Sequence, residues 1–422
     1  MKRPLNQLIK FSEGLRELKN NPVFLNSFSF DTGYSKANVI RREIVSSADF
    51  IKLRLEEEIH NQHFSNKQNV YSPKQIQKAF CLLPGNAPLY AFCAKVLVPC
   101  MLYDIDLTIS FPSRLKTSKK YLLDLFSTYL PSITIIEDRN KGELFNEMIN
   151  NSDVDTIIVF ASDEWIGSYI PDIVRSNKRL IFEGPGNDPC VVFEDYKSQD
   201  VGEIAKACLN NSGQSCSSIK RVYVNSSVYS NFIKELESEI DAIMVENPDS
   251  INSIKSPGIL TKIESQINEA KQKGAKILYG DGKVRNERFY PTIVLSPNNT
   301  SLVLEENFFA VTPVVVFDNK EELETMIFES DYGLNCSLFG NIPQDFLRTM
   351  QDTHKSTFVN STVVNPKNYH EITKLGGFKR SGFIIENGIK RQDSFCLEDL
   401  VWDANAYREE EFSYDLVSEF MD

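Results

Sequence analysis

A cysteine and a glutamate of this chain each lie in a polar segment beside an apolar run. Cys216 is in the small polar segment 211–218, between a helix-like stretch and the strand-like residues 220–224. Glu183 follows the apolar run 180–182 and precedes a segment rich in glycine and proline. A thiol and a carboxylate held at the ends of hydrophobic strands can act as a nucleophile and a base. The pair therefore indicates covalent catalysis.

Composition bounds the class of protein. The 422 residues are 41% hydrophobic and 25% charged, which is typical of a globular protein, and this length predicts two domains. The net charge of −12 argues against a nucleic-acid partner or an anionic membrane surface. The sequence shows neither a secretory signal nor an apolar run long enough to span a bilayer. We expect a soluble, cytoplasmic protein.

The eight cysteines do not form CxxC pairs, and most lie in apolar runs. This usage predicts free thiols in a reducing compartment, and seven of them are expected to be packing residues. His60 and His63 have the spacing of metal ligands but lack partners, so we expect a solvated helix end and no metal site.

Two series of short β-branched runs alternate with helical patterns, which predicts βαβ units and parallel sheets. The first series has strands at 107–109, 133–136, 156–160 and 180–182, and helices near 119–130, 143–150 and 164–177. The second has strands at 190–193, 221–225, 290–295, 314–317, 336–339 and 357–360, and helices at 199–210, 228–244, 260–273, 320–329 and 343–352. An amphipathic helix at 40–59 and a buried helix at 90–103 precede them. We predict an α/β fold with an N-terminal and dinucleotide-binding unit at 1–184, a cysteine-bearing unit at 185–395, and a C-terminal segment at 396–422 with an acidic tail.

Five segments in one order resemble the aldehyde dehydrogenase superfamily over roughly residues 70–400. They are Leu83-Pro84-Gly85-Asn86-Ala87-Pro88, Phe182-Glu183-Gly184, Gly213-Gln214-Ser215-Cys216, Glu305-Glu306-Asn307-Phe308 and Leu375-Gly376-Gly377-Phe378-Lys379-Arg380-Ser381-Gly382. The resemblance implies two Rossmann-like domains with the active site in the cleft between them. It also implies that Cys216 is the nucleophile, that the Asn86 amide stabilises the oxyanion, and that Glu183 is the general base.

The resemblance further implies a nicotinamide cofactor. Glu306 matches the residue that binds the nicotinamide ribose, and Phe308 matches one that shapes the nicotinamide pocket. The other residues expected at the cofactor are Ser110, Pro112, Arg114, Ser162, Gly167 and Gly184.

Three departures from the family pattern change the expectation. The segment Phe111-Pro112-Ser113-Arg114 lacks the usual lysine and has a guanidinium where the family has a carboxylate, so we predict NADP in preference to NAD. In the phosphate-binding segment, Asp163 places a carboxylate near bound phosphates, which is unfavourable. The hairpin that usually builds the oligomer is largely missing from 63–72, so a homodimer is plausible and a monomer remains open.

Each site residue also has a simpler interpretation. Cys216 can be a small core side chain, Glu183 a surface carboxylate at a strand end, and Asn86 a turn residue. Glu305 and Glu306 can be ordinary charges in the first turn of a helix. The glycines at 376, 377 and 382 can serve close backbone packing.

The leading hypothesis is the NAD(P)-dependent oxidation of an aldehyde to its acid through a thiohemiacetal and a thioester. A second is an NADPH-dependent acyl-thioester reductase, because 155–164 resembles that branch, although an activating Glu183 favours hydrolysis. A third is a catalytically degenerate homologue, suggested by the altered phosphate segment. The sequence does not define which aldehyde or acyl thioester is the substrate.

Overall fold

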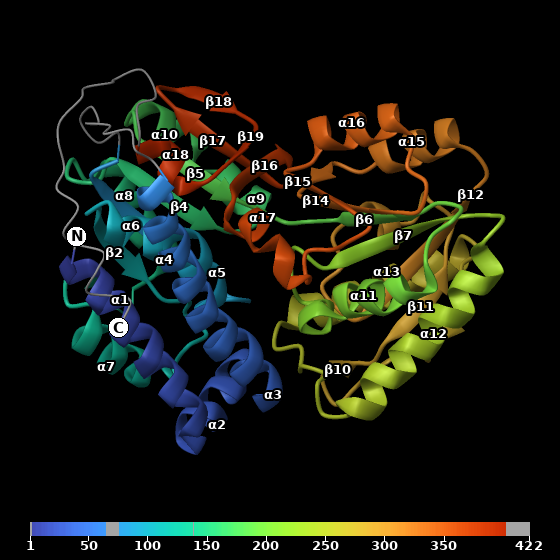
Figure 1. Cartoon of the computed structure of the whole chain (residues 1–422), viewed down its shortest axis with the longest axis horizontal. Helices are drawn as coiled ribbons and strands as arrows, with labels where there is room; N and C mark the ends of the chain where they lie inside the picture. The colour runs from blue at the N-terminus through green and yellow to red at the C-terminus, as the bar shows by residue number, and fades with distance from the viewer. Residues whose placement is uncertain (1, 65–75, 138, 402–422) are drawn as a thin grey trace.

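The computed structural model describes residues 2–64, 76–137 and 139–401. Two seven-stranded sheets organise the chain, with strand orders β18-β17-β5-β4-β1-β2-β3 and β15-β14-β6-β7-β12-β11-β8. Figure 1 shows one sheet in each half of the molecule, with helices on both faces of each. The predicted α/β fold with two parallel-sheet units is therefore confirmed.

The first sheet is parallel from β5 to β3, with two antiparallel strands at one edge. Its strands are β1 (Lys78–Leu82), β2 (Asp106–Ser110), β3 (Thr134–Ile135), β4 (Thr156–Phe160), β5 (Arg179–Glu183), β17 (Gly382–Glu386) and β18 (Ile389–Arg391). Helices α1 (Lys2–Glu17) and α7 (Lys119–Tyr129) pack on one face, and α8 (Lys141–Asn150) and α10 (Ile170–Arg175) on the other. Because both faces are covered, the central strands are almost continuously apolar.

The second sheet is parallel except for β8, which is antiparallel to β11. Its strands are β6 (Asp188–Val192), β7 (Ile219–Asn225), β8 (Lys276–Tyr279), β11 (Thr292–Leu295), β12 (Val311–Phe317), β14 (Asn335–Phe339) and β15 (Ser356–Val359). Helices α11 (Ser198–Cys208) and α12 (Tyr229–Glu246) cover one face, and α15 (Lys320–Phe328) and α16 (Gln344–Thr353) the other. Helix α13 (Pro257–Gln272) packs near β11 and β12.

Helices before β1 form a bundle on the first sheet, and the remaining elements of the chain are short. The bundle contains η1 (Leu18–Asn20), α2 (Pro22–Thr32), α3 (Lys36–Asn38), η2 (Val39–Ser46) and α4 (Ser47–Phe64). The helix predicted at 90–103 is α5 (Tyr90–Phe92), η3 (Cys93–Leu97) and α6 (Val98–Leu102). The short elements are α9 (Asp163–Gly167), η4 (Asn210–Gly213), β9 (Val284–Arg285), β10 (Arg288–Phe289), α14 (Ser301–Leu304), β13 (Tyr332–Gly333), η5 (Pro366–Asn368), α17 (Tyr369–Thr373), β16 (Leu375–Lys379), β19 (Asp393–Phe395) and α18 (Leu397–Val401). Within the described ranges, no helix combines the length and apolarity that crossing a bilayer requires.

Two details differ from the sequence-based expectation. The helix predicted at 164–177 is wrong as a single element: α9 ends at Gly167, and α10 begins at Ile170 with Pro171 in its first turn. Strands β17 and β18 follow the second sheet in the chain but return to the first, where β17 pairs with β5 and β18 pairs with β17 (Figure 1). The domain bounds at 184 and 395 stay a prediction.

The acidic tail, the segment 65–72 and the side chains of His60 and His63 lie outside the described residues.

The chain passes directly from the carboxyl edge of the first sheet to the amino edge of the second. Strand β5 ends at Glu183, and β6 begins at Asp188. Since strands β6, β7, β12 and β15 are parallel, the segments that precede them lie at the edge that faces β5. Ligands of such sheets bind at the carboxyl ends of strands where the order reverses, here between β1 and β4.

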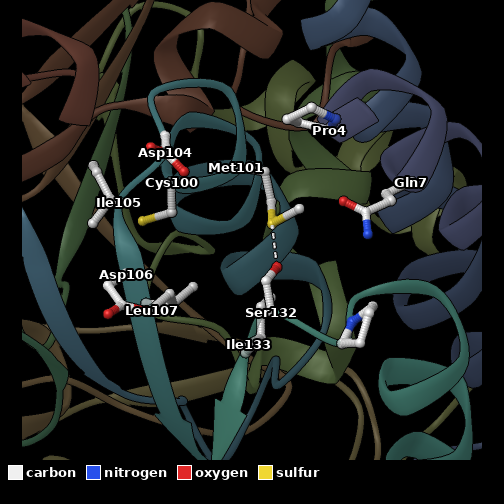
Figure 2. Close-up of a pocket in the computed structure, with 11 residues that line it drawn as sticks. Pro4, Gln7, Cys100, Met101, Asp104, Ile105, Asp106, Leu107, Ser132 and Ile133 are labelled. Atoms are coloured by element: carbon white, nitrogen blue, oxygen red, sulfur yellow. Dashed lines mark hydrogen bonds between the residues drawn. The ribbon is translucent and has the colours of Figure 1, made fainter. Parts of the chain in front are cut away.

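A pocket of about 590 Å³ lies at the opposite edge of the first sheet (Figure 2). Cys100 and Met101 line it together with Asp106, where β2 begins, and Gln7 of α1. Because the carboxyl ends of β1, β4 and β5 are at the other edge, this pocket is separate from the predicted catalytic residues.

Candidate active site

The loop that carries Cys216 has an unusual backbone conformation. It leads from η4 into β7, and Cys216 is half-buried. Asn211 and Ser212 have φ values of 53° and 59°, in the left-handed region that side chains other than glycine rarely adopt. Asn252 holds this turn: its Nδ2 donates to Asn211 Oδ1 at 2.8 Å, and its backbone N–H donates to Ser212 Oγ at 2.9 Å. Strain of this kind persists only where surrounding contacts enforce it.

The N-terminal bundle also fixes the cysteine loop. Arg42 donates to Asn210 Oδ1 at 2.8 Å and to Ser215 Oγ at 3.2 Å. Tyr34 Oη accepts a hydrogen bond from Asn211 Nδ2 at 2.8 Å. Helices that lie far from the cysteine in sequence therefore set the position of the residues on its N-terminal side.

Asn86 lies in the connection that follows β1 and approaches the same loop. Its Nδ2 is 3.5 Å from the Gln214 carbonyl oxygen, a long hydrogen bond. The buried Glu43 carboxylate accepts from the backbone N–H groups of Leu89 and Tyr90, at 3.0 and 3.3 Å. Glu43 thus stabilises the first turn of the helix that begins just after Asn86.

Glu183 is buried at the end of β5 between two lysines. Its Oε2 pairs with Lys95 Nζ and lies 3.6 Å from Lys355 Nζ. Both lysines also donate to the Lys374 carbonyl, at 2.9 and 3.2 Å. Glu183 Oε1 accepts no hydrogen bond from any of the described residues. This oxygen is therefore available to accept a proton or to bind water.

Gly186 brings the segment after Glu183 against the cysteine. Its backbone N–H donates to Glu306 Oε1 at 3.0 Å. A Cβ atom at this position would lie 2.0 Å from the Cys216 carbonyl oxygen, so only glycine allows the approach. Cys216, Glu306 and the connection from Glu183 therefore meet at Gly186.

The charges around Cys216 oppose one another. Burial raises the pKa of the thiol; Glu306 and Glu183 raise it further, whereas Lys95 and Lys355 lower it. Burial likewise raises the pKa of Glu306, against the effect of Lys220. The pKa of Lys220 is lowered by burial to about 8, and its Nζ lies 5.1 Å from the centroid of the Phe308 ring.

The predicted phosphate-binding segment contains two carboxylates that Arg380 engages. Ser162 caps the N-terminus of α9, and its Oγ accepts from Trp165 N–H at 3.3 Å. Asp163 and Glu164 lie in the first turn of this helix. Arg380 pairs with Asp163, and with Glu164 at 2.5 Å. Burial acts to raise the pKa of Asp163, but the pairing with Arg380 outweighs it and holds this pKa below its ordinary value. The single positive charge of Arg380 thus offsets one of the two negative charges of Asp163 and Glu164.

The remaining predicted cofactor residues lie at the same edge of the first sheet. The Gly184 N–H donates to the Ser381 carbonyl oxygen at 2.9 Å. A Cβ atom at position 184 would lie 2.8 Å from the Arg380 carbonyl oxygen. Gly167 is exposed, and nothing lies within 4 Å of where its Cβ would be. Pro112 is half-buried after β2.

Two cations lie beyond the end of β2. Arg114 donates to the Gly85 carbonyl at 2.8 Å, which commits one of its five donors to the loop that carries Asn86. Lys141 Nζ lies 2.5 Å from Ser110 Oγ, which itself donates to Ile136 at 3.1 Å. Segment 111–114 has no lysine, but Lys141, at the start of α8, places an ammonium group beside the end of β2.

Sequence reasoning missed several of these residues. Lys95 offered a signal, because a lone lysine within an apolar run is seldom fully buried without a partner. Tyr34, Arg42 and Lys355 gave no local signal, since their importance depends on contacts with residues far along the chain.

Comparison with known proteins defines the class. The model of the aldehyde dehydrogenase family matches residues 132–398. The chain is 24% identical over 394 residues to lactaldehyde dehydrogenase of Escherichia coli (strain K12), covering 89% of this chain and 80% of that protein. It is 26% identical to 3-sulfolactaldehyde dehydrogenase of Priestia aryabhattai over 61% of this chain, and spans about half (54%) of that relative.

Solved structures agree on the fold. The crystal structure of the Escherichia coli lactaldehyde dehydrogenase superposes with a TM-score of 0.74 at 22% identity, covering 90% of this chain and 82% of the other. An aldehyde dehydrogenase from Brucella melitensis gives 0.76 at 18% identity, covering 97% and 86%.

The chain therefore belongs to the aldehyde dehydrogenase family. It is an oxidoreductase acting on aldehydes, in a family that depends on NAD or NADP.

Proposed function

We propose that the chain oxidises an aldehyde to a carboxylic acid, with Cys216 as the nucleophile, Asn86 as an oxyanion donor and Glu183 as the general base. One observation carries this assignment: the loop after β1 and the connection after β5 both approach the Cys216 loop, at Gln214 and at Gly186. Neither contact is explained by packing of a single sheet, because the three segments come from two sheets.

The residues supply each step of this chemistry. The Cys216 thiolate attacks the carbonyl carbon, and the carbonyl oxygen gains the negative charge. The Asn86 amide and the Cys216 backbone N–H donate to that oxygen. After hydride leaves the carbon, a thioester links the acyl group to Cys216. Glu183 takes a proton from water, which attacks the thioester, releases the acid and returns the free thiol.

The site fits a nicotinamide dinucleotide, whose oxidised ring accepts the hydride. Glu306 and Phe308 lie beside the Cys216 loop, consistent with the nicotinamide end. Two carboxylates in the first turn of α9 disfavour phosphate, and Arg380, which bridges them, is the cation that makes the segment compatible with it. We assign Ser162, Gly167 and Gly184 to the same binding surface.

NADP is the preferred cofactor in this proposal. Arg114 and Lys141 place two cations near the carboxyl end of β2, with Ser110 and Pro112, where a parallel-sheet dinucleotide site holds the adenosine ribose. A 2′-phosphate pairs with such cations, whereas a free 2′-hydroxyl is usually bound by a carboxylate. The ratio of kcat/KM for NADP and NAD tests this preference, and a clear advantage for NAD contradicts it.

A short polar aldehyde is the proposed substrate. Hydroxyl groups flank the cysteine, since Ser215 Oγ and Ser217 Oγ lie 3.1 Å apart, and Arg42 contacts Ser215. Relatives are named for lactaldehyde, 3-sulfolactaldehyde, glutarate semialdehyde and succinate semialdehyde. These four compounds form a suitable panel. The homodimer expected from the sequence remains a prediction.

The deciding experiment supplies each panel aldehyde with NADP, and separately acetyl-CoA or succinyl-CoA with NADPH, to the full chain and to Cys216→Ser. We expect NADPH formation in the first assay and its loss in the variant. Turnover in the second assay alone overturns aldehyde oxidation in favour of acyl-thioester reduction. Undiminished activity of Cys216→Ser overturns the assigned nucleophile.

A further inference from the structure

Arg42 is a largely buried arginine that the reaction steps above do not use. It lies in η2 of the N-terminal bundle, and 11% of its side chain is exposed. Its guanidinium donates to Ser215 Oγ at 3.2 Å, and Ser215 directly precedes the proposed nucleophile Cys216. A permanent cation is therefore bonded to the neighbour of the reacting thiol.

The segment that carries the proposed oxyanion donor also contacts Arg42. The ring of Tyr90, the first residue of α5, has its centroid 4.9 Å from Arg42 Cζ, a cation–π contact. Asn86 lies just before this helix, and its Nδ2 approaches the Gln214 carbonyl at 3.5 Å. A substrate carbonyl must reach both the cysteine loop and Asn86. Arg42, which contacts both segments, is therefore placed to bind the rest of a short substrate.

The hydrogen bonds of Arg42 go to neutral acceptors. Its Nη1 donates to Asn210 Oδ1 at 2.8 Å, and its Nη2 donates to the Ser215 hydroxyl. Its Nε is buried and forms no hydrogen bond with any residue of the described ranges. A guanidinium has five N–H donors in a planar fork, so Arg42 keeps donor capacity for a ligand.

Glu43 compensates the charge of Arg42 incompletely. Its Oε1 lies 3.8 Å from Arg42 Nε, which is too long for a hydrogen bond. Its Oε2 accepts from the backbone N–H groups of Leu89 and Tyr90. Burial raises the pKa of Glu43, although Arg42 acts to lower it. The guanidinium thus keeps positive charge that an anionic ligand can neutralise.

We propose that Arg42 determines substrate specificity by binding an anionic group at the far end of the substrate. The preferred substrate is then a short aldehyde that carries a carboxylate or a sulfonate. This inference rests on the proposed oxidation of an aldehyde at Cys216. The paired N–H donors of a guanidinium match two oxygens of such a group. Aldehydes with only hydroxyl groups or an alkyl chain lack this pairing and should be poorer substrates.

The test compares kcat/KM with NADP within two matched pairs of aldehydes, on the full chain. The pairs are succinate semialdehyde with butanal, and 3-sulfolactaldehyde with lactaldehyde. We expect wild type to prefer the charged member by at least about tenfold, as typical hydrogen bonds to a charged group would give. A preference in one pair alone supports the proposal for that anionic group. Equal values within both pairs overturn it.

Variants show whether Arg42 causes the preference. In Arg42→Gln the ratio of kcat/KM within each pair should fall towards one. A loss of loop geometry through Ser215 lowers both members of a pair alike and leaves this ratio unchanged. Arg41→Gln is the matched control, because it removes the same charge from an exposed neighbour that contacts Asn38. A wild-type ratio in Arg42→Gln overturns the proposal, and Arg42→Met gives the same comparison if Arg42→Gln does not fold.

Binding of acids without turnover separates failure of this inference from failure of the proposed function. Succinate and butyrate share one carboxylate, and only succinate has a second. By titration calorimetry, wild type should bind succinate at least about tenfold more tightly than butyrate, and Arg42→Gln should lose this difference. If no aldehyde of either pair is oxidised, the proposed function fails, and this comparison decides the anion site alone. If the aldehydes are oxidised but the two acids bind equally, the function stands and the anion site fails.

Discussion

Substituting Gly186 by alanine should disable the enzyme without unfolding it. Gly186 is buried where the connection from Glu183 passes the Cys216 loop, and it donates its N–H to Glu306. A methyl group here would point at the Cys216 carbonyl oxygen, at 2.0 Å. The Cβ position is fixed by the backbone of residue 186, and the oxygen belongs to the backbone of Cys216, so rotation of a side chain cannot relieve the clash.

The size of the effect follows from the distance. Cβ atoms practically never approach another heavy atom closer than 3.0 Å, so the two segments must separate by about 1 Å. Displacing a reactive group by about 1 Å can cost about 100-fold in rate, which corresponds to roughly 2.7 kcal/mol in the activation free energy. We expect kcat/KM to fall by this factor.

The assay compares kcat/KM for the best panel aldehyde with NADP, in wild type, Gly186→Ala and Gly258→Ala. Gly258 is the matched control, because a Cβ there meets only Ser256 Oγ at an ordinary 3.8 Å. Thermal unfolding of each variant separates loss of geometry from loss of the fold. A folded Gly186→Ala with wild-type kcat/KM refutes the close approach of these segments.

Three further outcomes are expected. Asn86→Ala should lower kcat by about 100- to 1,000-fold, as loss of an oxyanion donor does, and a decrease below tenfold contradicts the assigned role. Arg380→Gln leaves Asp163 and Glu164 unpaired, so the Kd for NADP from quenching of protein fluorescence should rise at least about tenfold; an unchanged Kd contradicts the phosphate assignment. Burial lowers the pKa of His354 to about 3. Between about pH 6.5 and 3, His354 is therefore protonated in the unfolded chain but neutral in the folded chain. Over that range the wild-type free energy of unfolding, relative to His354→Gln, should fall by about 1.4 kcal/mol per pH unit as the pH drops, and urea titrations that show no such difference contradict it.

The fold was largely predictable because its signals are local. The β-branched runs at 156–160 and 180–182 became β4 and β5, since strands covered on both faces must be apolar along their whole length. The break between α9 and α10 was predictable in principle from Pro171. The pairing of β17 with β5 was not, because it joins segments about 200 residues apart.

The candidate site divides in the same way. Cys216, Glu183 and Asn86 were recognisable because they lie in short motifs with a fixed order. The lysines around Glu183 were not, since Lys95 and Lys355 meet only when the two sheets come together. Arg114 was predicted to face a ribose, and its contact with Gly85 depends on a loop from another strand. Motifs identify the chemistry, whereas the charges that tune it come from tertiary contacts.

Mass spectrometry of the acyl-enzyme shows whether Cys216 carries the acyl group during turnover. In Glu183→Gln the thioester should form but hydrolyse slowly, because no carboxylate activates water. After mixing with NADP and the best panel aldehyde, we predict one acyl group per chain on the peptide that contains Cys216, with a matching burst of NADPH. An unmodified Cys216, or an acyl group on a different residue, contradicts the assignment of Cys216 as the nucleophile.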